Sequence, residues 1–203
     1  MRRRRGRPKG ATSDATRARI LAAARRSFAE LGFAGTTNKD IADGAGITAA
    51  ALYGYFDSKA DLYAATARDA QAELLPAFRR AADAEATARG ALRAVMAASA
   101  RLHARDPSLA AFLSAMPIEL KREAEIARAM DEAPSEILAL FQSIVDRGVK
   151  RREISRARAR HVVSMFLACS MGMSLLAATF GADDFDRTMD AFLALVDGEL
   201  FSR

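Results

Sequence analysis

The sequence has 203 residues, of which 51% are hydrophobic and 28% are charged, so it is long enough for a globular protein with a sizeable core. Its single cysteine, Cys169, excludes an intramolecular disulfide framework, and no apolar leader follows the arginine-rich N-terminus, so we expect a cytoplasmic protein. The net charge of +6 arises in residues 1–12, because acidic and basic residues balance in the remainder. Alanine and arginine dominate and β-branched runs are absent, which predicts an all-α fold.

Residues 1–12 are interpreted as a basic, flexible arm. The segment Arg5-Gly6-Arg7-Pro8 is similar to the core of an AT-hook, whose arginines enter the narrow minor groove of A·T-rich DNA. Clustered arginines also neutralise phosphates and release counterions. A solvated tail is the alternative, but we favour a DNA-binding arm in which Arg5 and Arg7 contact the duplex.

The first helix is expected over residues 13–31. Its apolar residues fall on one helical face and its arginines lie off that face, with Gly32 supplying the left-handed residue that ends it. The apolar face consists of Ile20, Leu21, Ala24, Phe28 and Leu31.

Residues 37–56 predict two short helices joined by a tight turn. Thr37 and Asp40 form a capping box for the first helix, and Gly46 allows the backbone to leave that helix. Thr48 caps the second helix, which continues through Tyr53. Neither helix buries enough surface alone. The pattern is that of a helix-turn-helix, and we expect its second helix to lie in the major groove of DNA.

The next segments predict further amphipathic helices. A second capping box, formed by Ser58 and Asp61, opens a helix that is expected to end before or at Pro76. Helices are then expected over residues 85–105, over 108–115 with an end at Met116-Pro117, in the charged stretch 118–130, and over 135–148. The basic run from 150 to 160 is interpreted as a solvated connector, with a second DNA surface as the alternative.

Residues 162–180 contain no charge over nineteen residues, a length that permits a membrane span. We favour a buried helix, because serines dilute its hydrophobicity and the next segment carries a regular apolar stripe. Together these two helices exceed what one chain can bury, which predicts a four-helix interface in a homodimer. The expected interface residues are Ser170, Ser174, Ala178, Phe185, Met189, Phe192 and Val196.

Over residues 15–64 the sequence resembles the TetR family of bacterial one-component transcription regulators. The resemblance is carried by a set of short motifs: Phe28, Gly32, Gly35-Thr36-Thr37, Ile41-Ala42, Gly46-Ile47, Leu52-Tyr53, Phe56, Ser58-Lys59 and Leu62. It implies an all-α chain with an N-terminal three-helix helix-turn-helix DNA-binding domain and a larger C-terminal helical domain for ligand binding and dimerisation. We place the arm at 1–12, the DNA-binding domain at 13–58 and the effector-binding domain at 59–203.

The resemblance also implies roles for matched residues. Thr48 and Ala49 would face base edges, whereas a second group would contact phosphates: Thr37, Asn38, Lys39, Tyr53, Tyr55 and Lys59. A packing role for Tyr53 and a solvated capping role for Lys59 are the alternatives. The family usually has Leu-Tyr-Tyr-His-Phe where this sequence has Leu52-Tyr53-Gly54-Tyr55-Phe56, which removes one aromatic contact.

Regulators that this sequence resembles usually enclose a small-molecule cavity among their middle helices. Bulky, adaptable side chains suit an apolar ligand, although at these spacings core packing is the alternative. The candidate lining residues are Met96, His103, Phe112, Met116, Phe141, Met165, Phe166, Cys169 and Met173. Cys169 could sense redox state only in an exposed, electropositive setting.

The leading hypothesis is a homodimeric repressor that binds double-stranded operator DNA and is released by an unidentified small, apolar effector. A ligand-independent architectural DNA-binding protein is the alternative. We expect no membrane association, no cofactor, no metal site and no catalytic residues, since phosphate loops and paired metal-binding histidines are absent from the sequence.

Overall fold

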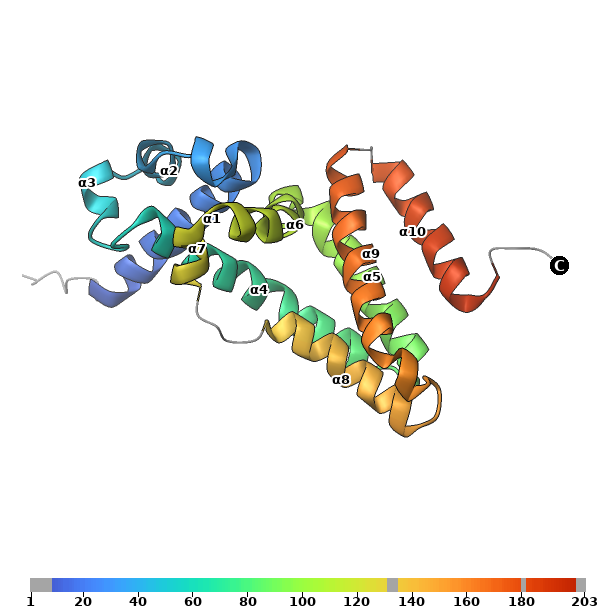
Figure 1. Cartoon of the computed structure of the whole chain (residues 1–203). Coiled ribbons are helices and arrows are strands. Elements are labelled where there is room, and N and C mark those ends of the chain that lie inside the picture. The colour runs from blue at the N-terminus through green and yellow to red at the C-terminus, as the bar shows by residue number, and fades with distance from the viewer. Residues whose placement is uncertain (1–8, 131–134, 180–181, 200–203) are drawn as a thin grey trace, which may run out of the picture. The chain divides into compact units, whose positions relative to one another are not determined.

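The computed structural model describes residues 9–130, 135–179 and 182–199, and omits the side chains of residues 9–12, 103, 174–179 and 182–186. Regular structure in these residues is helical throughout, as expected (Figure 1). The helices are α1 (Lys9–Gly35), α2 (Asn38–Ala45), α3 (Ala49–Leu52), α4 (Lys59–Asp83), α5 (Ala88–Arg105), α6 (Pro107–Arg122), α7 (Ala124–Ala129), α8 (Glu136–Lys150), the 3₁₀ helix η1 (Arg156–Arg158), α9 (Ala159–Thr179) and α10 (Ala182–Asp197).

The described residues divide into two compact units. The first unit comprises residues within Met1–Asp69 and Pro117–Asp131, and the second comprises residues within Ala70–Met116 and Glu132–Arg203. Helices α4 and α6 each contribute residues to both units. The predicted domain limits, 13–58 and 59–203, stay a prediction, because a compact unit is not by itself an independently folding domain.

Helix α1 packs against α2 in the first unit and buries most of the predicted apolar face (Figure 1). The helix differs from the prediction in three respects. It begins at Lys9, it resumes after a kink at Gly32 with φ 69° and ψ 176°, and Leu31 is 50% exposed. The kink follows from glycine, since this backbone conformation is nearly inaccessible to other residues.

Three aromatic rings form the centre of the first unit and join α1 to α4. The ring of Tyr63 lies 4.9 Å from that of Phe28 and 5.6 Å from that of Phe33, and the two phenylalanine rings are 6.0 Å apart. All three side chains are almost fully buried. Such edge-on and tilted pairs add about 0.5–1.5 kcal/mol each to the effect of burial, so this cluster fixes the platform for the helix-turn-helix.

Two prolines that were expected to end helices lie inside them. Pro76 is within α4 and Pro117 is within α6, so both predicted ends are wrong. Proline removes one backbone hydrogen bond and costs about 3 kcal/mol in a helix interior. In α4, the side chains of Leu74, Leu75 and Phe78, on either side of Pro76, are buried. Their burial offsets the cost of the proline, because it requires the helix to continue past residue 76. The charged stretch 118–130 forms the end of α6 and the whole of α7.

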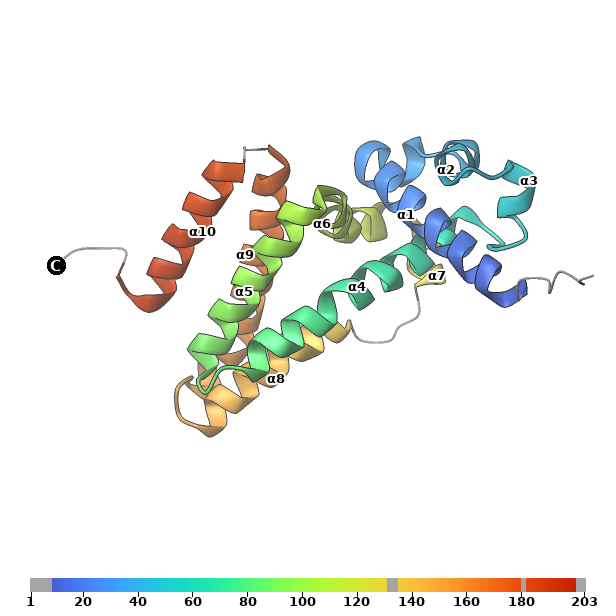
Figure 2. The same cartoon turned by 180° about the vertical axis from the view of Figure 1, so that it is seen from behind.

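The second unit is a bundle in which α5 packs against α8, α9 and α10, while α9 also packs against α8 and α10 (Figures 1 and 2). Helix α5 begins later than predicted, because Thr87 caps it through a 3.0 Å hydrogen bond from the Gly90 amide. Ser135 caps α8 as predicted. The predicted break at 131–134 lies outside the described residues.

Within the single chain, helix α9 is not buried on all sides, and its burial by a second copy stays a prediction. Met165 is 49% exposed and Met171 is 39% exposed, because this face of α9 has no partner helix among the described residues. Within the described ranges, none of the helices has the length and apolarity required to span a lipid bilayer.

Candidate functional site

The helix-turn-helix begins with a complete capping box on α2. The hydroxyl of Thr37 accepts a 3.2 Å hydrogen bond from the Asp40 amide, and the Asp40 carboxylate accepts a 2.9 Å hydrogen bond from the Thr37 amide. Hydrogen bonds from the Thr37 side chain and backbone lower the pKa of Asp40 below its ordinary value. The predicted start of α2 is therefore confirmed.

The turn after α2 depends on Gly46, which has φ 67° and ψ 39°. Its amide donates back to α2, and the Ile47 amide donates to Ala42 over 3.0 Å. Thr48 then caps α3 by accepting from the Ala51 amide over 3.1 Å. Both predicted signals, the left-handed glycine and the threonine cap, are confirmed.

Helix α3 is shorter than expected, since it ends at Leu52 instead of continuing through Tyr53. The Gly54 amide bonds the Ala51 carbonyl, and the Phe56 amide bonds the Leu52 carbonyl. This tighter turn buries both Leu52 and Phe56. Burial of these two side chains outweighs continuation of the helix through glycine, which is a poor helix former.

The exposed surface of α2 and α3 brings together several of the predicted DNA contacts. The Asn38 side-chain amide donates to the Tyr53 hydroxyl over 3.1 Å. Tyr53 is 59% exposed, so it is not a core residue. Lys39 is exposed and pairs with Asp43 one turn along α2 over 3.4 Å. Thr48 is exposed at the start of α3.

The other predicted DNA contacts are placed differently. Ala49 and Tyr55 are half-buried. Arg5 and Arg7 lie outside the described residues. Lys59 is half-buried, and its ammonium group donates to the backbone carbonyls of Phe33 over 2.8 Å and Thr36 over 3.0 Å. The same ammonium group lies 4.3 Å from the centre of the Phe33 ring.

Two residues to which the sequence analysis assigned no role, Thr36 and Glu119, hold this end of α1. The Thr36 hydroxyl is buried and donates to the carbonyls of Gly32 over 2.7 Å and Ser27 over 3.0 Å. A Glu119 carboxylate oxygen accepts from the Phe33 amide over 3.4 Å. Burial raises the pKa of Tyr63, and the nearby charge of Glu119 raises it further. Thr36 could be suspected from its position between two helices, but no local signal identifies Glu119.

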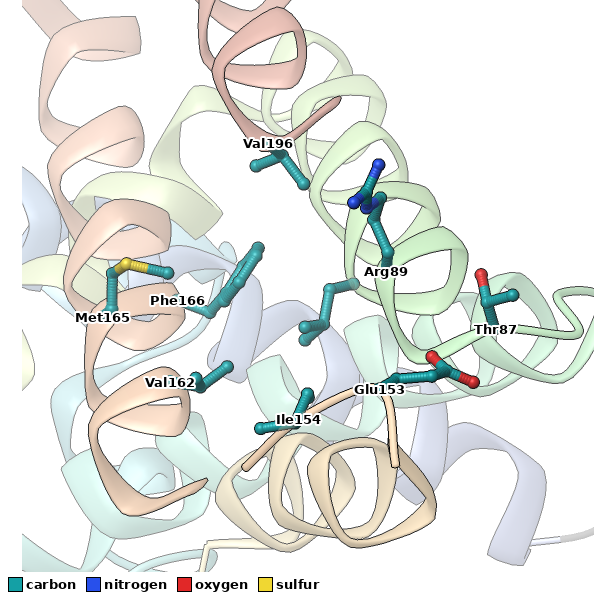
Figure 3. A pocket seen from close by; sticks show the side chains of 9 residues that line it. Thr87, Arg89, Glu153, Ile154, Val162, Met165, Phe166 and Val196 are labelled. Carbon is teal, nitrogen blue, oxygen red and sulfur yellow. The ribbon is translucent and has the colours of Figure 1, made fainter. Parts of the chain in front are cut away.

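A cavity of about 620 Å³ lies in the second unit, walled by the start of α5, the α8–α9 connection, α9 and α10. We call it the ligand cavity. Figure 3 shows Val196 and Arg89 on one side of it and Ile154 and Val162 on the opposite side. The lining residues are Thr87, Arg89, Leu92, Glu153, Ile154, Val162, Met165, Phe166 and Val196.

The predicted ligand-binding residues reach this cavity only in part. Met165 and Phe166 line it, whereas Met96, Phe112 and Phe141 are almost fully buried core residues. A third group comprises half-buried Met116 and Cys169, buried Met173, and His103, whose side chain is not described. Burial raises the pKa of the Cys169 thiol, which disfavours the reactive thiolate.

The predicted dimer residues also have mixed positions. Met189 is buried, Ser170 and Phe192 are half-buried, and Val196 lines the ligand cavity. The Phe192 ring instead meets Phe166 edge-on at 6.0 Å. The side chains of Ser174, Ala178 and Phe185 lie outside the described residues.

Glu153, also missed from the sequence, ties the α8–α9 connection to α5. Its carboxylate accepts a 2.6 Å hydrogen bond from the Ala88 amide in the first turn of α5, where the helix dipole favours an anion. Arg89 adds a positive charge to the same wall. Within the described residues, no group of three or more side chains could hold a metal ion.

Comparison with known proteins finds similarity to bacterial regulatory proteins over the helix-turn-helix. Residues 20–66 match the family described as bacterial regulatory proteins, tetR family. The HTH-type transcriptional regulator TtgR of Pseudomonas putida is 51% identical over 47 residues, which is 23% of this chain and 22% of TtgR. The sequence match thus spans less than a quarter of that relative.

Solved structures extend the similarity of fold to nearly the whole chain. The regulator FadR of Bacillus subtilis, in complex with stearoyl-CoA, has a TM-score of 0.72 and 21% identity, covering 91% of this chain and 99% of FadR. AibR, in complex with isovaleryl coenzyme A and operator DNA, has a TM-score of 0.68 and 18% identity, covering 89% of this chain and 97% of AibR. The predicted all-α fold, with an N-terminal helix-turn-helix and a larger helical C-terminal part, is confirmed.

Proposed function

We propose that this chain is a homodimeric repressor of the TetR family, which a small ligand releases from its operator. The proposal rests chiefly on one observation: the capped pair α2 and α3 exposes Lys39, Thr48 and Tyr53 and holds half-buried Asn38 against the Tyr53 hydroxyl. The matched relative is named as a transcriptional regulator, and its family consists of regulatory proteins.

DNA recognition combines phosphate contacts with limited base readout. Lys39, Asn38 and Tyr53 carry polar groups that suit phosphate oxygens. Thr48 and Ala49 enter the major groove, where the threonine hydroxyl can bond a base and the alanine methyl can contact thymine. Because Ala50 and Ala51 offer no hydrogen-bonding side chain, phosphate contacts and the basic arm supply much of the affinity.

Dimerisation places two such helix pairs on successive turns of one DNA face. The exposed apolar side chains Met165 and Met171 of α9 and Leu195 of α10 support this proposal, since a second copy would cover them. A two-fold dimer binds half-sites about one helical turn apart. The operator is therefore expected to be pseudo-palindromic.

Ligand response requires different ligand affinities for two arrangements of the protein. The ligand cavity supplies the site, and the structure of AibR with isovaleryl coenzyme A and operator DNA supports a ligand response in proteins of this fold. Helices α4 and α6 contain residues of both units, so a shift of either helix would reach the helix-turn-helix.

The proposal is tested by selecting DNA fragments with the purified protein from random sequence at physiological salt. We expect enrichment of a pseudo-palindrome, bound by a dimer and released by a compound found in a screen. Thr48→Ala should reduce the preference for that sequence, whereas Tyr53→Phe should weaken binding to all sequences alike. Binding that shows little preference between sequences, at any ligand concentration, would instead indicate the architectural alternative.

A further inference from the structure

A second cavity, of about 780 Å³, is open to solvent and adjoins the ligand cavity at the α8–α9 connection, and its arginine residues are exposed. We call it the basic cavity. Its walls include Glu153, Ile154 and Val162, and the same three residues line the ligand cavity, so the two cavities are neighbours with shared walls. The remaining lining residues are Val149, Arg152, Ser155, Arg156 and Arg158.

The basic cavity carries excess positive charge. Three arginines, Arg152, Arg156 and Arg158, line it, and Glu153 is the single acidic residue in its lining. The Glu153 carboxylate already accepts a 2.6 Å hydrogen bond from the Ala88 amide. Throughout the part of the chain that the structure describes, none of the three guanidinium groups takes part in an ion pair or a side-chain hydrogen bond. The three groups therefore remain available to an anion.

The backbone of Arg152 adds a second, independent observation. This residue follows α8 with φ 62°, in a left-handed conformation that favours glycine. The turn is closed by a 2.9 Å hydrogen bond from the Glu153 amide to the Gly148 carbonyl. Glycine at position 152 would allow the same hydrogen bond. Arg152 therefore stands where the turn favours glycine, and its side chain lines the basic cavity.

We propose that the basic cavity binds the phosphorylated head of a ligand whose apolar chain occupies the ligand cavity. This inference rests on the proposed function, because it names the chemical class of the effector. Arginine binds phosphate through two parallel hydrogen bonds, and three arginines suit a head with more than one phosphate group. Leu92, Val162 and Phe166 offer the apolar walls that an acyl chain requires.

The full-length protein, without DNA, is titrated by calorimetry with two phosphorylated probes and their fragments. The phosphorylated probes are decanoyl-coenzyme A, with a nucleotide head, and decanoyl lysophosphatidate, with a lipid head. The fragments are decanoate and coenzyme A. We expect at least one phosphorylated probe to bind about tenfold more tightly than decanoate, and the tighter one identifies the source of the head.

Arginine variants test where the head lies. Arg156→Ala and Arg158→Ala should each lower the affinity for the phosphorylated probe about tenfold and leave the affinity for decanoate unchanged. Arg151→Ala is the matched control, because Arg151 is exposed, adjoins Arg152 and does not line the basic cavity. Arg152→Gly should lower the affinity for the same probe. Its melting temperature should not fall, since glycine adopts this backbone conformation without strain, so the variant separates an effect on binding from an effect on folding.

Three outcomes would overturn the inference: no probe binds, decanoate binds as tightly as the phosphorylated probes, or Arg151→Ala weakens binding as much as Arg156→Ala. A loss of operator affinity in the cavity variants equal to their loss of probe affinity would also overturn it, because the charge would then act on DNA. Operator binding by the unaltered protein is measured separately, so failure of the proposed repressor function is distinguishable from failure of this assignment.

Discussion

The ammonium group of Lys59 lies 2.8 Å from the carbonyl oxygen of Phe33, and this contact joins the start of α4 to the end of α1. A second hydrogen bond reaches the Thr36 carbonyl, immediately before the residue that caps α2. Hydrogen bonds from charged donors are stronger than those from neutral donors. Lys59 therefore holds in place the end of α1 and the backbone that leads into α2. The resemblance to TetR-family proteins implies a phosphate contact for Lys59, and that role stays a prediction.

Replacement of Lys59 by methionine, which preserves length but removes the donor, should destabilise the protein. We expect the free energy of unfolding to fall by about 1–3 kcal/mol, because two carbonyls lose a charged donor. Urea denaturation followed by circular dichroism measures the change.

Lys39→Met is the matched comparison for Lys59→Met. The Lys39–Asp43 pair is exposed and lies within one helix, so stability should change by less than about 0.5 kcal/mol. Operator affinity should fall instead, with a decrease of about 0.9 in the salt slope if one phosphate contact is lost. Equal stability of both variants would show that the carbonyl contacts of Lys59 contribute little.

Gly32→Ala should destabilise the first unit by about 1–3 kcal/mol, since its backbone conformation is nearly exclusive to glycine. A Cβ atom there would also lie 2.9 Å from a Glu119 carboxylate oxygen. Gly35→Ala provides the control, because its added Cβ would make an ordinary 3.4 Å contact. Thermal unfolding of the two variants should therefore differ in midpoint, and identical midpoints would contradict the assigned strain.

Tyr53→Phe should reduce operator affinity about three- to tenfold, the effect of losing one hydrogen bond. The hydroxyl accepts from Asn38 and is exposed, so the melting temperature should stay within about one degree of the parent value. Fluorescence anisotropy with a labelled operator measures the affinity. A drop in melting temperature with unchanged affinity would assign Tyr53 a structural role instead.

The capping box of α2 should make stability depend on pH at the acidic end. The folded pKa of Asp40 is lowered, so its contribution is complete above the pKa of the unfolded chain and is lost as pH falls through the folded pKa. Thr37→Ala removes the main cause of the lowered pKa. Its melting temperature should lie below that of the parent at neutral pH, and the gap should narrow in acid. A gap that stays constant with pH would contradict this assignment.

Local signals in the sequence predicted the helix starts well. Thr37, Thr48 and Ser135 cap helices as expected, and the Ser58 hydroxyl accepts from the Asp61 amide over 3.0 Å in the predicted box. Each of these contacts joins residues three positions apart, so its geometry follows from the helix itself. The prolines at 76 and 117 were misjudged, because the cost of a lost hydrogen bond is local while the burial that offsets it comes from elsewhere in the fold.

The sequence by itself determined that this protein is helical, that its N-terminal part is a helix-turn-helix and that its excess positive charge lies in the arm. Those properties depend on periodicity, short-range capping and composition. Only the tertiary structure decided that Lys59 bonds Phe33, that Glu153 bonds Ala88 and that the basic cavity adjoins the ligand cavity. Such contacts join residues 26 and 65 positions apart, and packing of the whole chain determines which distant groups meet.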